Sequence, residues 1–385
     1  MSRFIQLHIL TSYPAANLNR DDLGAPKSMR YGDTNRLRVS SQSLKRAWRT
    51  SNTFKDALGG THHLGTRTKE VGRKVFIALT QGAPFEAAWT DESATGSLAT
   101  LKEKPSVEIA RAIAGIFGKI KKEADAKSDK EASAVKKREA LLESLEIEQL
   151  AHVSDEERQA VAALTEACRA SGKIPEGDAL SLLRQNAQAA DIAMFGRMLA
   201  ASARFNVEAA VQVAHAVTVH KAVAEDDFFT AVDDLNRDDA GAGHMGVLEF
   251  GAGLYYLYIC IDRALLAQNL DGDQALVEKS LTALTTAACT VAPTGKQASF
   301  ASRAYACFAL AEKGDDTPRN LSLAFLKPVE APAEGGIGEK AIDELLKTKE
   351  KIDTVYGQSL TVEALDVFKG EGSLAALCEF VAKDA

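Results

Sequence analysis

The segment Arg38–Arg49, with the sequence RVSSQSLKRAWR, concentrates side chains that bind anions. It holds three arginines, one lysine, three serines and a glutamine, and it contains no acid. Ser40 or Ser41 is expected to begin a helix, because serine hydroxyls cap helix N-termini. Exposed backbone N–H groups and the helix dipole make that end attractive to phosphate. The segment therefore predicts a docking site for a phosphodiester backbone, and the alternative is a solvated basic helix that has no ligand.

The spacing within this helix, which should reach Thr50, places its polar side chains on neighbouring faces. Lys45 and Arg49 lie four residues apart, and so do Gln42 and Arg46. The apolar residues recur at three- and four-residue spacing and predict a buried inner face, made of Leu44, Ala47 and Trp48. The helix should thus present a cationic ridge that holds a polyanion without reading its sequence.

Charge is unevenly distributed along this acidic chain, whose formal net charge is −7. Residues 1–50 carry nine basic and three acidic groups, giving +6, and residues 119–138 carry eight and four, giving +4. Residues 205–250 carry two basic and nine acidic groups, giving −7. The pattern favours a polyanion on one surface and a second copy of the chain on another.

Patterning along the 385 residues predicts an α+β fold with a large helical insertion. Residues 4–10 alternate as a strand, 11–35 have the composition of a long loop, and 60–185 show helical periodicity. Further strands are expected at 207–220, 246–262, 304–312 and 321–327, and further helices at 273–290, 337–355 and 372–384. Without the insertion, the order predicts a ferredoxin-like, RNA-recognition-motif sheet with one face open to a ligand.

Other signals point to an ordinary soluble protein. Hydrophobic residues make up 46% of the chain, no apolar run is long enough to span a bilayer, and the five cysteines form no CxxC pair. The segment GAGHMG matches GxGxxG but precedes a strand, so dinucleotide binding is rejected. His62 and His63 are adjacent without further ligands, and His215 and His220 are interpreted as structural. A cytoplasmic protein with no cofactor and no metal is expected.

Five segments, in this order, resemble the CasC family, which forms the backbone subunit of the type I-E CRISPR Cascade complex. They are LNRDD (18–22), RVSSQSLKRAWR (38–49), FGRM (195–198), FFTAVDDL (228–235) and GKQASFA (295–301). The resemblance implies a hand-shaped subunit, with a palm at 1–59 and 186–385, helical fingers at 60–185 and a thumb hairpin at about 222–252. It implies that copies line up along a CRISPR RNA and display it for pairing with target DNA.

The resemblance also assigns contacts by position. Those to guide RNA are Arg20, Lys27, Arg38, Ser40, Gln42, Lys45, Arg46, Arg49, Met198, Phe228, Phe229, Thr230 and Lys296. A looser set in the fingers would contact DNA and comprises Lys119, Lys121, Lys122, Lys136, Lys137 and Arg138. Asp33, Thr34 and Asn35 depart from the basic run expected before the helix. Other Cascade subunits and a recruited helicase-nuclease are the remaining implied partners, with no membrane.

Two alternatives remain beside this non-enzymatic reading. Asp33 is a carboxylate that could lie near a bound backbone, as in RNA-cleaving CRISPR backbone proteins. A generic, sequence-tolerant RNA-binding module would also use a cationic track with stacking surfaces. The acidic thumb residues, among them Asp233 and Asp234, are expected to dock on the basic track of the next copy in a head-to-tail contact.

Overall fold

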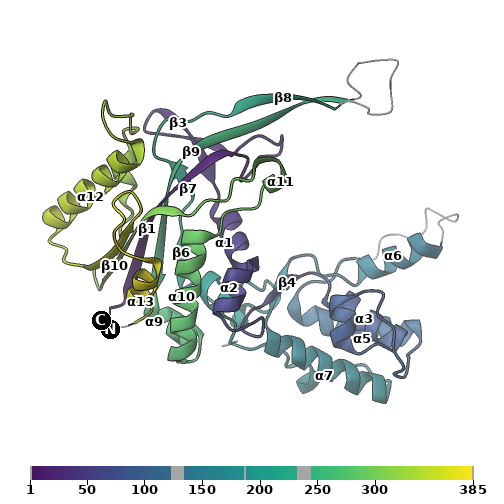
Figure 1. Ribbon diagram of the computed structural model, residues 1–385. Coiled ribbons are helices and arrows are strands. Elements are labelled where there is room, and N and C mark those ends of the chain that lie inside the picture. The colour runs from purple at the N-terminus through teal and green to yellow at the C-terminus, as the bar shows by residue number, and fades with distance from the viewer. Residues whose placement is uncertain (1, 123–133, 186–187, 232–243, 384–385) are drawn as a thin grey trace, which may run out of the picture. The chain divides into compact units, whose positions relative to one another are not determined.

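The computed structural model describes residues 2–122, 134–185, 188–231 and 244–383, and the chain forms two compact units (Figure 1). Unit 1 comprises Met1–Gly60, Val211–Leu266 and Asp273–Ala385, and unit 2 comprises Thr61–Ala210 and Ala267–Gly272. Each unit has its own sheet and its own helices. Within the described ranges, no helix is both long enough and apolar enough to cross a bilayer.

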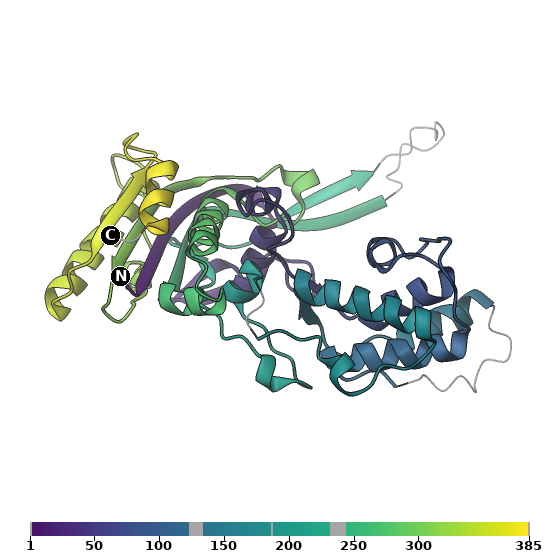
Figure 2. The same cartoon turned by 90° about the horizontal axis from the view of Figure 1, so that it is seen from below.

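Unit 1 is built on an antiparallel sheet whose central strands are β1 (Phe4–Ala16) and β9 (His244–Asp262). The strand order is β11-β10-β1-β9-β7-β3-β2, and β6 and β8 also pair with β9. The remaining strands are β2 (Ser28–Tyr31), β3 (Thr34–Val39), β6 (Val211–Val213), β7 (Ala216–Thr218), β8 (Glu225–Ala231), β10 (Ala306–Gly314) and β11 (Thr361–Asp366). Seen from below, β8 and the start of β9 project from this sheet as a two-stranded ribbon (Figure 2).

The helices of unit 1 lie between and after these strands. They are α1 (Ser41–Thr50), α2 (Asn52–Ala57), α10 (Gln274–Thr290), α11 (Gln297–Phe300), the 3₁₀ helix η3 (Leu321–Phe325), α12 (Ile337–Tyr356) and α13 (Leu374–Ala382). A further helix, α9 (Arg263–Asn269), follows β9 directly. The mixed α+β class is therefore as predicted, with an antiparallel sheet in unit 1.

The prediction that one face of the sheet is open is wrong. Register pairs Leu10 with both Tyr256 and Phe308, so these three side chains share a face. They are buried in a core with η3 and α12, to which Phe325 and Ile342 contribute. The C-terminal elements η3 and α12 therefore cover the sheet face that was predicted to be open to a ligand.

Three local predictions also fail. Residues 11–35 are not one loop, because β1 continues to Ala16 and a β2–β3 hairpin follows. Its two-residue turn, Gly32–Asp33, has φ of +58° at both residues, as a type I′ hairpin requires. The predicted strand at 207–220 is two short strands, β6 and β7, and the one at 321–327 is the helix η3. Strand β11 was not predicted.

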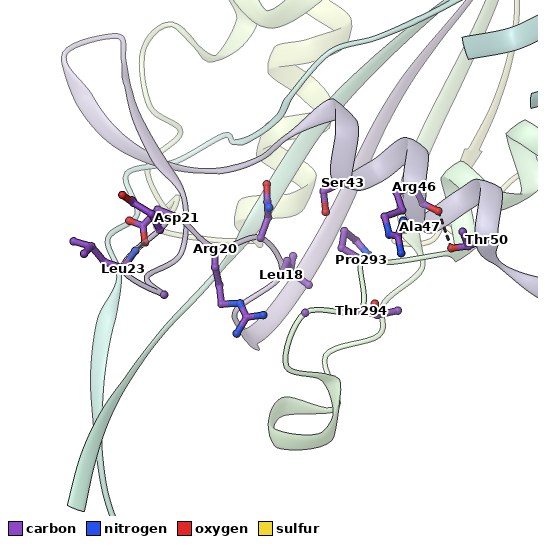
Figure 3. Close-up of a pocket in the computed structure, with 14 residues that line it drawn as sticks. Leu18, Arg20, Asp21, Leu23, Ser43, Arg46, Ala47, Thr50, Pro293 and Thr294 are labelled. Atoms are coloured by element: carbon purple, nitrogen blue, oxygen red, sulfur yellow. Dashed lines mark hydrogen bonds between the residues drawn. The ribbon is translucent and has the colours of Figure 1, made fainter. Parts of the chain in front are cut away.

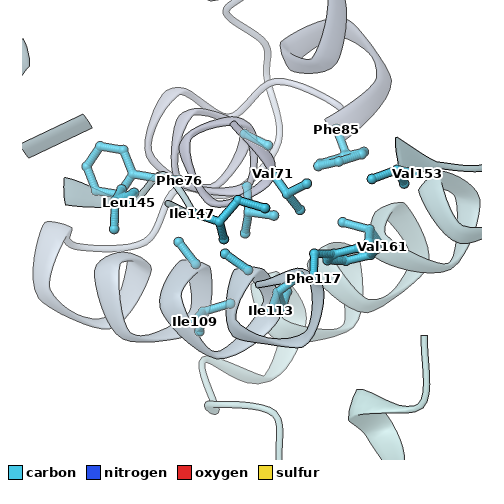
Figure 4. Packing of buried hydrophobic residues seen from close by; sticks show 14 of the residues in the cluster. Val71, Phe76, Phe85, Ile109, Ile113, Phe117, Leu145, Ile147, Val153 and Val161 are labelled. Carbon is cyan, nitrogen blue, oxygen red and sulfur yellow. The ribbon is translucent and has the colours of Figure 1, made fainter. Parts of the chain in front are cut away.

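Unit 2 is mostly helical, as the Ala-, Glu- and Lys-rich composition predicted, and it has its own core (Figure 4). Its elements are β4 (Thr66–Thr68), α3 (Val71–Gln81), α4 (Phe85–Thr90), α5 (Glu103–Phe117), α6 (Ala134–Ser144), β5 (Ala151–Val153), α7 (Asp155–Ser171), η1 (Gly177–Leu180), α8 (Ala190–Phe195) and η2 (Ala203–Phe205). Ile113 and Phe117 of α5 pack there against Val71 of α3 and Val161 of α7. Ser154 caps α7 through a full capping box with Glu157.

Unit 2 extends beyond the predicted boundary at residue 185 and reaches Ala210. The Arg197 guanidinium donates to the Glu157 carboxylate at 2.8 Å, and both side chains are fully buried. The Asp191 carboxylate accepts from the Gly65 backbone N–H at 2.8 Å and contacts the His152 ring at 2.9 Å. These buried contacts tie residues 188–210 to the helical unit.

Candidate nucleic-acid interface

Helix α1 forms as the sequence predicted. Ser40 is the N-cap, and its hydroxyl accepts the Ser43 backbone N–H at 3.3 Å. Leu44 and Trp48 are buried, so the inner face anchors the helix in unit 1. No acid lies in its first turn, and Arg49 lies in its last. The outer face thus combines a favourable N-terminal field with cationic side chains.

The LNRDD segment is held against the start of this helix. The Asn19 carboxamide oxygen accepts the Ser40 backbone N–H at 2.9 Å, and the Asn19 carbonyl accepts the Lys27 N–H at 2.8 Å. Asn17 donates to the carbonyl oxygens of Gly24 and Glu249 at 3.0 and 2.8 Å. These bonds hold the loop that carries Arg20 close to α1.

The loop, α1 and residues 293–295 enclose a hollow of about 640 Å³, here called the first hollow (Figure 3). Arg20 lines it from the loop, and Ser43 and Arg46 line it from α1. Two acids of the loop, Asp21 and Asp22, also line it. The Asp21 carboxylate accepts backbone N–H groups of its own loop, so it shapes that loop. The predicted contacts Arg20 and Arg46 therefore meet in one space.

The other predicted contacts near α1 lie around this hollow. The side chain of Gln42 is exposed, and those of Lys45 and Arg49 are half-buried on the same helix. Ser40 is buried at 7% exposure, where it serves as the cap. Lys296 is exposed in the segment that follows Gly295, and its backbone has φ of +53°.

Arg38 belongs to a different hollow, of about 420 Å³, which is also lined by Tyr31, His215 and neighbouring residues. Lys27 does not line it and is linked to Arg38 through the backbone. The Arg38 guanidinium donates to Nδ1 of His215 at 2.9 Å, and Arg38 N–H donates to the Lys27 carbonyl at 2.8 Å. Burial lowers the pKa of His215, and the charges of Arg38 and Lys27 lower it further. His215 thus stays neutral beside two cations.

The β8–β9 ribbon carries the predicted aromatic contacts. Its register pairs Phe228 with Val247, Phe229 with Gly246 and Thr230 with Met245. Both phenylalanines are exposed, Phe228 at 64% and Phe229 at 42%. Consecutive residues of a strand point to opposite faces, so the ribbon offers an aromatic side chain on each. Its predicted acids Asp233 and Asp234 lie outside the described residues.

Other predicted residues lie in unit 2. Met198 is 76% exposed directly after the buried Arg197. Lys119 and Lys121 form ion pairs with Glu148 and Glu146 at 2.8 and 2.7 Å. Lys122 follows them, and Lys136, Lys137 and Arg138 are exposed on α6. These residues belong to unit 2, whereas the first hollow belongs to unit 1.

Arg36 is one of the nine basic groups in residues 1–50 whose excess positive charge favoured a polyanion partner. Its side chain is fully buried. The guanidinium donates to the carbonyl oxygens of Tyr31, Thr218 and Phe325 at 3.3, 3.0 and 2.8 Å. Arg36 therefore ties β3 to β7 and η3, and it is not available to a ligand.

A family model described as CT1975-like protein, of the Cas_CT1975 family, matches residues 5–378. The chain belongs to the CT1975-like Cas family. Its structure is also similar to a chain from a "CRISPR RNA-guided surveillance complex, pre-nicking", at 26% identity and a TM-score of 0.75, with 98% of this chain and 99% of that one covered. A second chain, from a "CRISPR RNA-guided surveillance complex", is 20% identical with a TM-score of 0.68 and the same coverage, and shares the fold. A comparison with curated proteins finds no match.

Sequence reasoning missed two residues of the CT1975-like chain that lie near α1. Arg303 and Tyr305 are exposed and follow the GKQASFA segment closely. They line a third hollow with α1 and α2. The available signal was the basic residue in SRAY, directly after a segment already singled out.

Proposed function

We propose that this chain is a non-catalytic, CRISPR RNA-binding backbone subunit of a Cascade-type surveillance complex, of the type I-E kind. The observation that carries the proposal is the end-to-end similarity to a chain of a CRISPR RNA-guided surveillance complex at 26% identity. Family membership over residues 5–378 supports it. In such complexes base pairing reads sequence, and protein holds the backbone and its shape.

The fold of unit 1 supports the palm and thumb of this proposal. The strand–helix–strand–strand–helix–strand order runs through β1, α1, β6 with β7, β9, α10 and β10. Strand β10 lies beside β1, and β6 and β7 lie beside β9, as a ferredoxin-like palm requires. The β8–β9 ribbon would be the thumb, and unit 2 would be the fingers.

The chemistry of the first hollow supports RNA as the ligand. Arg20 and Arg46 face one space beside a capped helix end, and both are exposed. No hydrogen bond or ion pair joins either guanidinium to another residue in the described ranges. Two such cations can each neutralise one phosphate, which gives affinity without sequence readout.

Self-assembly along the RNA belongs to the same proposal. Glu225, Asp226 and Asp227 are exposed on β8, beside exposed apolar side chains. An acidic ribbon repels RNA, so its natural partner is a cationic surface of a second copy. Asp226→Lys with Asp227→Lys should shorten the particles formed on long RNA. Unchanged particle length would rule this contact out.

The test of RNA binding is co-expression of the chain with the partner subunits and a CRISPR array, and purification through a tag on this chain. The co-purified RNA is then sequenced. Lys45→Ala, Arg46→Ala and Arg49→Ala are combined, and the matched control is Lys340→Ala, Lys347→Ala and Lys351→Ala on α12. A discrete repeat-derived RNA that is lost only in the α1 variant supports the proposal.

Other outcomes would contradict it. RNA of mixed origin would favour a generic RNA-binding module. Periodic cuts in the bound RNA that disappear in Asp33→Ala would favour the RNA-cleaving alternative. Asp33 lies at the tip of the β2–β3 turn, 98% exposed at its side chain, with Arg30 at 3.4 Å. If a correctly folded particle contained no RNA, α1 would be a solvated basic helix without a ligand.

A further inference from the structure

A third hollow, of about 730 Å³, adjoins the first one in unit 1. Ala47, Thr50 and Thr294 line both hollows, so the two are continuous along the C-terminal half of α1. The third hollow continues over the start of α2 to Arg303 and Tyr305. An RNA strand bound in the first hollow could therefore extend into the third hollow.

The third hollow differs from the first in charge. Asp21 and Asp22 line the first hollow, whereas no acidic residue lines the third. Arg303 supplies its positive charge and is exposed. Over the described ranges, no other residue forms an ion pair or hydrogen bond with that guanidinium. An anionic group can bind there without displacing a protein partner.

Hydroxyl and amide groups make up most of the remaining polar lining. The Thr50 hydroxyl donates to the Arg46 carbonyl at 2.8 Å, and the Thr290 hydroxyl donates to the Thr286 carbonyl at 2.7 Å. Each oxygen therefore keeps lone pairs that can accept a hydrogen bond. Acceptors of this kind suit a ribose 2′-hydroxyl or the N–H groups of a base. Asn52 adds an amide that can both donate and accept.

Tyr305 provides an aromatic surface in the lining of the third hollow. Its side chain is 73% exposed, although large aromatic residues usually bury most of their surface. An exposed ring beside a cation is the arrangement on which single-stranded nucleic acids stack a base. The ring lies two residues after Arg303, within reach of one nucleotide step.

We propose that the third hollow holds one further nucleotide of the guide RNA, with its phosphate on Arg303 and its base on Tyr305. The inference rests on the proposed function and extends it, because none of the residues assigned from the resemblance lines this hollow. The Thr50, Thr290 and Asn52 oxygens receive the ribose or base donors. Single-stranded RNA is the class of ligand.

The test uses the RNA recovered from the wild-type particle, remade with 4-thiouridine and a fluorescent label. Ultraviolet crosslinking to the purified full chain, followed by tryptic mass spectrometry, should label Ala304–Lys313, the peptide that contains Tyr305. Arg303→Gln and Tyr305→Ala should each weaken binding about tenfold. Arg303→Gln should also reduce the slope of log K against log salt by about 0.7.

Matched controls remove the same chemistry elsewhere in unit 1. Lys347→Gln removes an exposed cation, and Tyr356→Ala removes a tyrosine that is 76% exposed. Tyr305→Phe keeps the ring and should retain the crosslink and the affinity. Melting temperatures equal to wild type would establish that the Arg303 and Tyr305 variants fold.

Each failure has a separate signature. If the wild-type particle holds no RNA, the proposed function and this inference both fall. If it holds RNA, but the Arg303 and Tyr305 variants bind like the controls, only this inference falls. Loss of a protein subunit from the particle with unchanged RNA affinity would also overturn it, because the surface would then belong to a protein interface.

Discussion

Unit 1 contains two regions that hold cations in different surroundings. Under α12, Arg319 donates to Glu312 and Asp353 at 2.6 Å each, and Lys349 approaches the same two carboxylates. Along α1, Arg46 is exposed and lines the first hollow. The first region neutralises its own charge, whereas the second leaves cations facing solvent. A cation whose donors are taken up by carboxylates or carbonyls of the fold is structural, whereas an exposed cation can meet a ligand.

The buried region is a connected network. The Tyr256 hydroxyl accepts the Leu321 N–H at 3.2 Å and lies 2.8 Å from Nδ1 of His8. Nε2 of His8 lies 3.0 Å from the Glu312 carboxylate, which Arg319 also binds. If His8 is neutral with its proton on Nε2, it donates to Glu312 and accepts from the Tyr256 hydroxyl, so both ring nitrogens have a hydrogen-bond partner. The network fixes η3 and α12 over the sheet.

The largest effect should come from breaking this network. Arg319→Met removes two hydrogen bonds from the fully buried Glu312 carboxylate, and should lower the free energy of unfolding of unit 1 by about 3–5 kcal/mol. Arg46→Met on α1 should change it by less than about 0.5 kcal/mol. Each unit contains one of the two tryptophans, so urea unfolding in a Trp89→Phe background follows unit 1 through Trp48. Equal midpoints for the two variants would erase the contrast.

The next largest effect should be a loss of stability in acid, which originates in the buried network. Burial lowers the pKa of His8 below its ordinary value of 6.5, although Glu312 opposes this. Burial favours a raised pKa for Glu312, but bonds from His8 and Arg319 outweigh it and lower that pKa to about 2. Below pH 6.5, His8 becomes protonated in the unfolded chain but stays neutral in the folded chain until a lower pH. The free energy of unfolding therefore falls as the pH falls.

A second loss should follow below the ordinary Glu312 pKa of 4.5, as pH falls toward 2. Both changes have the same sign, so unit 1 should be most stable above pH 6.5. His8→Gln should flatten the upper part of the profile and leave the lower part. The measurement is the urea midpoint against pH, and a profile unchanged by His8→Gln would contradict the assignment.

Local patterns in the sequence predicted the elements that depend on near neighbours. Ser40 as cap, Leu44 and Trp48 as inner face and the bounds of α1 all follow from residues within one helix. The same holds for α10 and α12, whose bounds differ by one residue at each end or less. The tight β2–β3 hairpin had a signal, Gly-Asp between two short alternating runs, which the loop-like composition concealed.

Features set by distant parts of the chain could not be predicted. The face of β1 that carries His8 looks half-polar and open, and it is buried by elements more than 300 residues away. Arg36 looks like its neighbour Arg38, and only tertiary contacts from residues 218 and 325 bury it. For the same reason, no local pattern linked Arg303 to α1.

A moderate effect on RNA affinity should distinguish the exposed arginines of the first hollow from the buried Arg36. Arg20→Ala with Arg46→Ala should weaken binding of single-stranded RNA by about a hundredfold and reduce the slope of log K against log salt by about 1.4. The melting temperature should not change, because both side chains are exposed. Arg36→Met should instead lower stability, since it leaves three carbonyls, two of them in buried contacts, without this donor. Filter binding measures the RNA affinity of all variants, and thermal melting measures their stability. If Arg36→Met lost RNA binding at unchanged stability, Arg36 would be an RNA contact and not a structural residue.

The smallest effect concerns Ser40, where the structural and anion-binding roles meet in one side chain. Ser40→Ala removes the cap of α1 and should destabilise unit 1 by about 1 kcal/mol. Ser40→Asp keeps a capping oxygen and adds a negative charge, so stability should stay within a few tenths of a kcal/mol of wild type. If phosphate approaches this helix end, the Asp variant should bind RNA more weakly than the Ala variant. Urea unfolding and RNA titration of both variants test this, and equal RNA affinities would place the guide backbone away from the N-terminus of α1.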